Sequence, residues 1–361
     1  MSGRGEPEKG LEVAWFAALC DDDYRFLGVP DPALVSSHPH CRDIVLRAER
    51  GGFDNVLLPS GYQLGIDSVA FAGAVAPELE RLKLLVAVRC GELWPPQLAR
   101  QLATLDRMLE GRLTINAISS DLPGAPLESG PRYARSLEVM QILRALLDGK
   151  PIDHRGEFFQ LAVDPPRIGT VTGRCPPLYF GGLSEDAREC ASAGADVYLL
   201  WPDRLEAVRE TLEDLRRRAR SKGRSLRFGY RAHVIVRETE AAARAAARTL
   251  VSQLEPATGA TIRGRSLDHA SVGVRRQAEL RGDADGEGYV EDNLWTGIGR
   301  ARSGCGAAVV GDPDQVVAKL LAYRDLGIDS FILSGYPHAE ECDRFAALVL
   351  QELRRAWNSV R

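Results

Sequence analysis

Short apolar runs alternate with helical patterns along the whole chain, and this alternation limits the possible folds more than any other feature. Eight strand-like segments can be recognised: Leu11–Leu19, Phe53–Pro59, Leu82–Val88, Arg112–Ile118, Leu178–Phe180, Asp196–Trp201, Arg227–Glu238 and Ile328–Ser334. Helical patterns follow the strands, as over Pro96–Leu109, where leucines recur on one helical face. Repeated β–α units predict an α/β fold, a (β/α)8 TIM barrel. A doubly wound open sheet is the alternative.

Two stretches interrupt the β–α alternation. Residues 121–173 contain one predicted helix, Arg132–Leu147, and a small hairpin is predicted near Phe158–Val163. Residues 255–306 are charged and Gly-rich, and they lie between the seventh and eighth strands, hence on the catalytic rim of a barrel. Inserted segments of this length are usually functional lids or disordered. Because no internal repeat is present, residues 1–361 are predicted to form a single domain with an inserted lid segment at 255–306.

The composition is typical of a globular protein and gives no sign of nucleic-acid or membrane binding. Hydrophobic residues make up 45% of the chain, charged residues 27%, and the formal net charge is -4. Basic residues form no stripe of the kind that binds nucleic acid. Residues 1–10 are polar, and no run reaches the roughly 18 apolar residues that a membrane-spanning helix needs. A cytoplasmic protein is therefore predicted.

The spacing of cysteines and histidines argues against a metal site. The seven cysteines are scattered, odd in number and nowhere arranged as CxxC. This pattern is typical of reduced thiols without structural zinc. His38 and His40 form an HPH motif, but no cysteine or carboxylate lies at ligand spacing beside them, so this motif is predicted to be a loop.

The segment Arg227–Glu238 combines an apolar strand pattern with two polar side chains. Alternate residues of a strand point to the same side, so Arg231 and His233 face the same environment. A guanidinium in a dry core would cost several kcal/mol or more without a partner, which favours a polar, ligand-filled pocket. The alternative is an edge strand on which both side chains face solvent.

In a TIM barrel, ligands bind at the carboxyl ends of the strands, and here polar and aromatic residues follow all eight. They are Cys20, Ser60, Arg89 with Cys90, Asn116 with Ser119, Gly181 with Gly182, Trp201, Arg231 with His233, and the run Ser334–His338. Residues 179–185 read as a strand, a Gly turn and a helix start, where free N–H groups and the helix dipole suit a phosphate. Neither GxGxxG nor GxxxxGK[ST] occurs, which disfavours a Rossmann or Walker-type site.

Three of these rim residues, and one residue of the second insertion, have chemically useful side chains. Trp201 could form a wall against an aromatic ligand or fill the core. Tyr336 and His338 follow a strand directly, and a phenol and an imidazole can donate hydrogen bonds or transfer protons, although they could also belong to a simple turn. Arg302, with Arg300, lies among flexible glycines, which suits a lid over an anion or a solvated charge pair. No triad order or carboxylate pair indicates a hydrolase.

Six segments of the chain resemble a known family in sequence and in order. They are LARQLATLDRMLEGR, PPLYFGGLSEDA, DVYLLW, RFGYRAHVIVRET, DNLWTGIGRARSGCGAAVVGDP and LGIDSFILSGYPHAEE. From about Trp15 to the last helix, the chain resembles the bacterial luciferase-like flavin monooxygenases. It is most similar to the two-component, FMNH2-dependent alkanesulfonate monooxygenases. The resemblance implies a luciferase-like TIM barrel and an FMN cofactor supplied as FMNH2 by a separate NAD(P)H-dependent FMN reductase.

The resemblance also implies roles for individual residues. Gly181, Gly182, Ser184 and Tyr133 would bind the FMN phosphate, and Asn116 would contact the flavin ring. The family's active-site positions are matched by Arg231, His233, Trp201, Tyr336 and His338, and its lid arginine is matched by Arg302. The implied reaction of FMNH2 and O2 forms a flavin peroxide, which oxygenates the carbon beside a sulfonate and releases sulfite and an aldehyde. Family members associate, so a homo-oligomer is expected.

The chain departs from the family pattern mainly in the substrate pocket. Cys20 replaces a histidine after the first strand, no cysteine occurs near Gly65, and Ser129 replaces a second histidine. The flavin positions match better than the substrate positions. The resemblance therefore leaves three alternatives to a sulfonate monooxygenase: the same chemistry on a sulfone or a biosynthetic intermediate, a deazaflavin-dependent oxidoreductase, and a non-catalytic flavin-binding protein.

Overall fold

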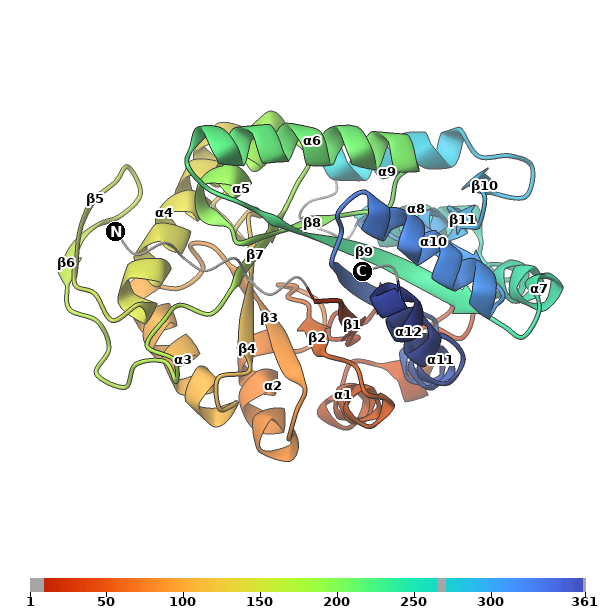
Figure 1. Cartoon of the computed structure of the whole chain (residues 1–361), viewed down its shortest axis with the longest axis horizontal. Helices are drawn as coiled ribbons and strands as arrows, with labels where there is room; N and C mark the ends of the chain where they lie inside the picture. Colours follow the sequence, from red (N-terminus) through yellow and green to blue (C-terminus); the bar gives the residue numbers. More distant parts are fainter. Residues whose placement is uncertain (1–9, 265–270, 360–361) are drawn as a thin grey trace.

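The computed structural model describes residues 10–264 and 271–359. Residues 1–9 of the polar segment predicted at 1–10, and residues 265–270 of the predicted lid, lie outside the described residues. Figure 1 shows most of the strands near the centre of the molecule, with helices around them.

Eight parallel strands form a closed ring, which confirms the predicted TIM barrel. They are β1 (Glu12–Phe16), β2 (Asn55–Leu58), β3 (Lys83–Arg89), β4 (Leu113–Ile118), β7 (Leu178–Gly181), β8 (Val197–Leu200), β9 (Arg227–Val236) and β13 (Ser330–Ser334). Each strand pairs in parallel with its neighbours in this ring, and the pairing of β8 with β9 closes it. The alternative prediction, an open, doubly wound sheet, is therefore wrong. Closure brings all eight carboxyl ends to one mouth.

Helices cover the outside of the ring (Figure 1). The α-helices of the β–α units are α1 (His38–Gly51), α2 (Ser68–Val75), α3 (Pro95–Met108), α4 (Ser129–Leu147), α5 (Glu185–Gly194), α6 (Leu205–Ser221), α7 (Glu240–Leu250), α10 (Pro313–Asp325), α11 (His338–Phe345) and α12 (Gln351–Ser359). Shorter helical turns are η1 (Pro32–Leu34), η2 (Ala76–Glu78), η3 (Gly297–Arg300) and η4 (Ala346–Leu350).

The HPH motif lies in a helix, so the predicted loop is wrong there. α1 begins at His38, and the Ser37 hydroxyl caps it by accepting a hydrogen bond from the His40 amide at 3.3 Å. Pro39 is tolerated because the N–H groups of the first helical turn have no intrahelical partner. The helical geometry directs His40 toward the loop that follows β1.

The barrel interior has an apolar middle and a polar layer at the amino ends of the strands. The middle is filled by side chains that include Phe16, Leu85 and Ile332. In the polar layer, buried Glu12 accepts hydrogen bonds from the Tyr179 hydroxyl at 3.0 Å and the Ser330 hydroxyl at 3.1 Å. These contacts link β1, β7 and β13 across the interior.

Both insertions contain regular structure. The hairpin predicted near Phe158–Val163 is β5 (Ile152–Arg155) with β6 (Gln160–Val163). Between β9 and β13 lie the following elements: α8 (Pro256–Gly264), α9 (Val272–Gly282), β10 (Tyr289–Glu291), β11 (Leu294–Trp295) and β12 (Ala308–Gly311). β12 pairs in parallel with β9 and thereby extends the sheet beside the barrel. Within the described part of the chain, every helix is too short or too polar to cross a bilayer.

Candidate active site

Arg231 lies inside the barrel mouth. It is only 4% exposed, and its guanidinium lies 4.3 Å from the centre of the Phe16 ring. Nη1 donates to the Ala232 carbonyl at 2.7 Å, whereas Nη2 has no hydrogen-bond partner among the described residues. Burial lowers the pKa of Arg231 from its ordinary value. The ordinary pKa of an arginine is so high that the guanidinium still keeps its charge at neutral pH. The alternative interpretation, an edge strand on which the side chain faces solvent, is therefore wrong. The mouth contains a buried cation.

His233 lies beside Arg231 and is fully buried. Its Nδ1 lies 2.8 Å from the Ser334 hydroxyl, and its ring stacks on Tyr336 with 5.1 Å between ring centres. Burial, reinforced by the positive charge of Arg231, holds the pKa of His233 well below its ordinary value, so the imidazole is neutral. Its Nε2 is buried and has no partner among the described residues.

Arg302 and Tyr336 meet at the same mouth. Nη1 of Arg302 donates to the Asp22 carboxylate at 2.6 Å and contacts the Tyr336 hydroxyl oxygen at 2.8 Å. Burial opposes the charge of Arg302, but Tyr336 and Asp22 hold its pKa above the ordinary value. Burial raises the pKa of Tyr336, so the phenol keeps its proton. Arg302 is thus part of the site, while Arg300 is exposed.

His338 forms the next part of the wall. Its ring lies 5.0 Å from that of Tyr336 and 5.6 Å from that of Phe16. Its Nδ1 lies 2.9 Å from Asp23, and its Nε2 has no partner among the described residues. The mouth therefore brings together five of the predicted catalytic residues, which are Arg231, His233, Arg302, Tyr336 and His338.

Asp22, Asp23 and Phe16 were missed by the sequence reasoning. The two carboxylates belong to the CDDD run at residues 20–23, directly after the first predicted strand. Their position directly after a barrel strand was the available signal, because such loops form the mouth. Phe16 looked like any other core residue of that strand, and its cation contacts arise from residues far away in the sequence.

A second cluster lies where β7 leads into α5. Gly182 has a φ of 139°, and a β-carbon added to it would lie 3.0 Å from the Tyr133 hydroxyl and 2.7 Å from Cβ of Ala187. Ser184 caps α5, accepting a hydrogen bond from the Ala187 amide at 3.2 Å. The structure thus brings Tyr133, Gly181, Gly182 and Ser184 to one helix start, which is a suitable place for an anion.

Trp201 and Asn116 make contacts other than those that define the two clusters. The Trp201 ring packs against the inserted segment, because β-carbons added at Gly273 and Gly304 would lie 2.9 and 3.3 Å from it. Trp201 is half-buried, so it neither fills the core nor lies freely at the mouth. Asn116 is half-buried on β4, in register with Tyr179 of β7. No polar contact connects Asn116 with Arg231 or His233 among the described residues.

Cys20 and Arg89 line another part of the rim. Arg89 is 8% exposed; it donates to the Ser120 hydroxyl and, at 3.1 Å, to the Ser60 carbonyl. Burial and the negative charge of Asp22 raise the pKa of Cys20 to about 12, so this thiol is not a nucleophile at neutral pH.

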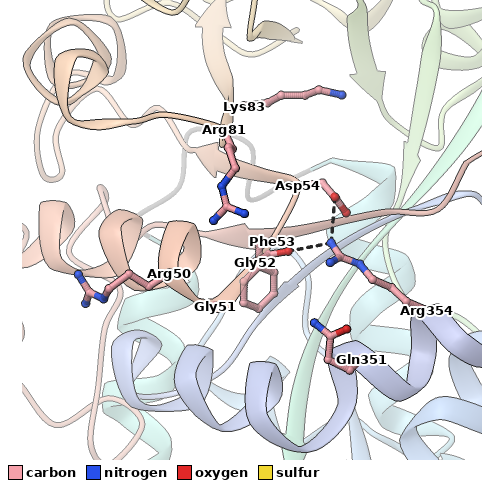
Figure 2. Close-up of a pocket in the computed structure, with 9 residues that line it drawn as sticks. All are labelled: Arg50, Gly51, Gly52, Phe53, Asp54, Arg81, Lys83, Gln351 and Arg354. Atoms are coloured by element: carbon pink, nitrogen blue, oxygen red, sulfur yellow. Dashed lines mark hydrogen bonds and ion pairs between the residues drawn. The ribbon is translucent and has the colours of Figure 1, made fainter.

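A basic pocket lies at the opposite end of the barrel, where β2 and β3 begin. It has a volume of about 510 Å³, and Figure 2 shows Arg50, Arg81, Lys83 and Arg354 around it. Arg354 donates to the Asp54 carboxylate at 2.9 Å and to the Gly52 carbonyl at 2.7 Å. None of the predicted site residues lines this pocket, and the amino ends of barrel strands usually serve stability.

All seven cysteines are free thiols. The described residues include no group of three or more His, Cys, Asp or Glu side chains placed to hold a metal ion.

Two curated proteins are similar to this chain over nearly its whole length. The sulfoquinovose monooxygenase of Novosphingobium aromaticivorans is 64% identical over 353 residues, which cover 96% of this chain and 98% of the relative. That of Agrobacterium fabrum is 51% identical over 346 residues, which cover 95% and 90%.

Solved structures show the same fold at low sequence identity. A riboflavin lyase has a TM-score of 0.79 at 18% identity, with coverage of 96% of this chain and 92% of that one. An EDTA monooxygenase from a Chelativorans species has a TM-score of 0.78 at 18% identity, with coverage of 96% and 94%. These likenesses support the barrel alone.

The family model described as luciferase-like monooxygenase matches residues 26–330. This match covers most of the chain, and both curated relatives are named monooxygenases. The predicted class of enzyme is therefore confirmed. The chain is a monooxygenase and belongs to the luciferase-like monooxygenase family, as its sequence segments indicated.

Proposed function

We propose that this enzyme uses FMNH2 and O2 to cleave the C–S bond of an organosulfonate, and that its substrate is sulfoquinovose, a sulfonated hexose. The proposal is supported by the relative that is 64% identical over 96% of the chain and is named for this substrate. In the balanced reaction, one oxygen atom of O2 ends in the aldehyde and the other in water. The flavin supplies two electrons, and sulfite leaves with release of one proton. A simple alkanesulfonate would have to bind the same mouth without the sugar hydroxyls.

The buried guanidinium of Arg231 is the observation on which the choice of an anionic substrate depends. Arg231 has no ion-pair partner among the described residues, and its Nη2 is unsatisfied. Arg302 lies near the same Phe16 ring, at 5.4 Å, and is balanced by Asp22. Arg231 is therefore a buried cation without a countercharge among the described residues, and a sulfonate would neutralise it with charge-assisted hydrogen bonds.

The residues present also fit an FMN cofactor. Gly182 leaves the space that a β-carbon would fill beside Tyr133, and Ser184 begins a helix whose free N–H groups suit the phosphate. Asn116 would contact the ring from β4. When bound, reduced flavin supplies the electrons that activate O2.

The remaining residues of the mouth are proposed to move protons and to shape the site. His233 is neutral and offers a free Nε2, so it can accept a proton from the substrate carbon. Tyr336 remains protonated and lies beside Arg302, so it can donate a hydrogen bond to developing negative charge. His338 packs against Tyr336 and has an unpartnered Nε2, and Trp201 would form a wall toward the inserted segment.

Three further proposals concern the surroundings of the site. A separate NAD(P)H-dependent FMN reductase is proposed to supply FMNH2, and the enzyme is proposed to act as a homo-oligomer. The insertion at 255–306, within a single domain, is proposed to serve the active site. It contributes Arg302 to the mouth and packs Gly304 on Trp201.

Sulfite release tests the proposed function. The purified enzyme would be mixed with FMN, NADPH and a flavin reductase, and then given sulfoquinovose, linear alkanesulfonates, dimethyl sulfone or glucose. Sulfite and one equivalent of an aldehyde are expected from sulfoquinovose, with slower release from alkanesulfonates and none from glucose.

Two results would reject the proposal. Substrate-dependent oxygen consumption without sulfite would favour another substrate for the same flavin chemistry. Tighter binding of a reduced deazaflavin than of FMNH2, measured by fluorescence titration, would instead favour a deazaflavin-dependent oxidoreductase.

A further inference from the structure

The carboxylate of Asp23 links two histidines behind the wall of the mouth. Asp23 is 5% exposed. Its Oδ1 lies 2.9 Å from Nδ1 of His338 and accepts a hydrogen bond from the His338 amide at 3.0 Å. Its Oδ2 lies 2.9 Å from Nε2 of His40. Three separate segments, the loop after β1, the first turn of α1 and the start of α11, therefore meet at one carboxylate.

Asp23 acts only as a hydrogen-bond acceptor. Burial opposes its charge, but the positive charge of His338 and hydrogen bonds from His338 and His40 hold the pKa of Asp23 well below its ordinary range. An ionised carboxylate cannot donate, so both ring nitrogens that contact it must carry protons. When the His338 ring is neutral, its single hydrogen is therefore held on Nδ1, and Nε2, which has no partner among the described residues, carries none.

His40 is placed to hold the other oxygen of Asp23. Its side chain is 11% exposed and lies outside the mouth, whereas Asp23 and His338 are fully enclosed. Without a donor on Oδ2, the carboxylate could rotate away from His338. The His38 ring, two residues earlier in the same turn, packs instead on Phe71 at 5.8 Å.

We propose that Asp23 and His40 are positioning residues for His338, which exchanges a proton with the bound substrate through Nε2. This inference rests on the proposed function, because it assigns His338 a part in that reaction. The proton on Nδ1 stays with Asp23 while Nε2 gains or loses its own, so the ring alternates between imidazolium and neutral imidazole. His40 acts only through Asp23.

Other ionisable groups around this unit are accounted for by different contacts. Asp22 pairs with Arg302, whose Nη1 also contacts Tyr336. His233 bonds to Ser334. Cys41 donates to the Ala18 carbonyl at 3.5 Å, and burial raises the pKa of its thiol to about 12. None of these groups replaces Asp23 as the acceptor for Nδ1 of His338.

The first test is the tautomer of His338 in the resting enzyme. Nitrogen-15 NMR of histidine-labelled protein reads this directly, with the His338 signals assigned by their loss in His338→Gln. In the wild type, hydrogen is expected on Nδ1. In Asp23→Asn, a mixture of tautomers or a shift to Nε2–H is expected. Hydrogen on Nε2 alone in the neutral wild-type ring would overturn the proposal.

The second test is steady-state sulfite release by variants at position 40. His40→Ala is expected to lower kcat about tenfold with KM changed less than about twofold, the size of one lost hydrogen bond to a charged group. His40→Gln keeps an N–H donor and should restore most of kcat. Asp23→Asn should lower kcat by roughly 10- to 100-fold, as expected when an orienting partner is lost. His38→Ala is the matched control and should behave like the wild type.

The outcomes separate this inference from the proposed function. If the wild type releases no sulfite, the proposed function fails, while the tautomer measurement still decides the role of Asp23. If sulfite is released but His40→Ala and His40→Gln match the wild type, the role of His40 is wrong. Thermal denaturation of each variant shows whether the fold is kept. If Asp23→Asn does not fold, the tautomer of His338 in the wild type and the kcat values of His40→Ala and His40→Gln decide the proposal.

Discussion

Arg231 and His233 share one face of β9 and one buried environment, but burial affects their charges differently. Burial lowers the pKa of both side chains. The guanidinium starts from a pKa so high that it stays charged, whereas the imidazole starts near neutrality and loses its proton. The same strand therefore places a fixed cation beside a neutral base. This pairing suits a reaction that binds an anion and moves a proton.

Replacing Arg231 should weaken the binding of an anionic substrate. Arg231→Ala is expected to lower kcat/KM for sulfite release by roughly 10- to 100-fold, the effect of losing one or two charge-assisted hydrogen bonds. Arg231→Lys should restore little, because an ammonium lacks the planar fork of donors. Exposed Arg300 supplies the control, and Arg300→Ala should retain activity. Unchanged turnover in Arg231→Ala would favour a non-catalytic flavin-binding protein.

His233 should make the protein less stable in acid. Its folded pKa lies below the ordinary value of 6.5, so below that pH the unfolded chain binds a proton that the folded chain does not. The free energy of unfolding should therefore fall as the pH drops below about 6.5, by up to about 1.4 kcal/mol per pH unit for this group. Urea denaturation from about pH 7.5 to about pH 5 measures the fall. His233→Gln should reduce it, while His38→Gln at an exposed position should not.

At the scale of elements, the turn from β7 into α5 has no room for a β-carbon at Gly182. Gly182 adopts a φ of 139° and lies against Tyr133 and Ala187, and the Tyr198 hydroxyl donates to its carbonyl. These contacts hold the backbone where α5 begins. The proposed phosphate site therefore depends on the absence of one β-carbon.

Gly182→Ala should disturb this turn and weaken FMN binding. The added methyl would meet Cβ of Ala187 at 2.7 Å and the Tyr133 hydroxyl at 3.0 Å. We expect a loss of roughly 1–3 kcal/mol in stability, and at least a tenfold rise in the Kd for FMN, worth about 1.4 kcal/mol. Fluorescence titration and thermal denaturation measure the two effects. Gly130→Ala in α4 has open space around it and should change neither. An unaltered Kd for Gly182→Ala would place the phosphate elsewhere.

At the scale of the whole molecule, the barrel is joined across its interior as well as around its ring. Glu12 of β1 accepts hydrogen bonds from Tyr179 of β7 and Ser330 of β13. These strands are not all neighbours, so the contacts stabilise closure rather than one pair of strands. Buried groups of this kind are costly when one partner is removed and the other is left.

A double-mutant cycle should detect this internal link. Glu12→Ala leaves the Tyr179 hydroxyl without its acceptor and should lower the free energy of unfolding by roughly 1–3 kcal/mol. Adding Tyr179→Phe should cost less in that background than in the wild type, with a coupling of roughly 0.5–3 kcal/mol. Tyr62 is 57% exposed, so Tyr62→Phe with Glu12→Ala should be additive. Additivity in both pairs would show that Glu12 and Tyr179 do not interact in solution. Urea denaturation gives all the values.

The sequence by itself determined the barrel and its family. Each strand is a short apolar run, and in the helices that follow, apolar residues recur at the helical period. Both signals can be recognised within one short segment of the sequence. Because parallel strands joined by helices must present their carboxyl ends together, the order of elements also indicated which residues lie at the mouth. The proposed flavin-binding roles of Tyr133 and Asn116 came from the family resemblance, whereas Arg231 was also indicated by its place on an apolar strand.

Only the tertiary structure decided which side chains meet. Asp23 lies 17 positions from His40 and 315 from His338, and no periodic pattern relates residues so far apart. For the same reason, the HPH motif looked like a loop without a carboxylate neighbour, and Trp201 could not be assigned to Gly273 and Gly304. Hydrophobic periodicity indicates the face of a helix or strand on which a residue lies. Which side chains it contacts depends on how the eight barrel strands close into a ring. Closure of the ring therefore assembled the site.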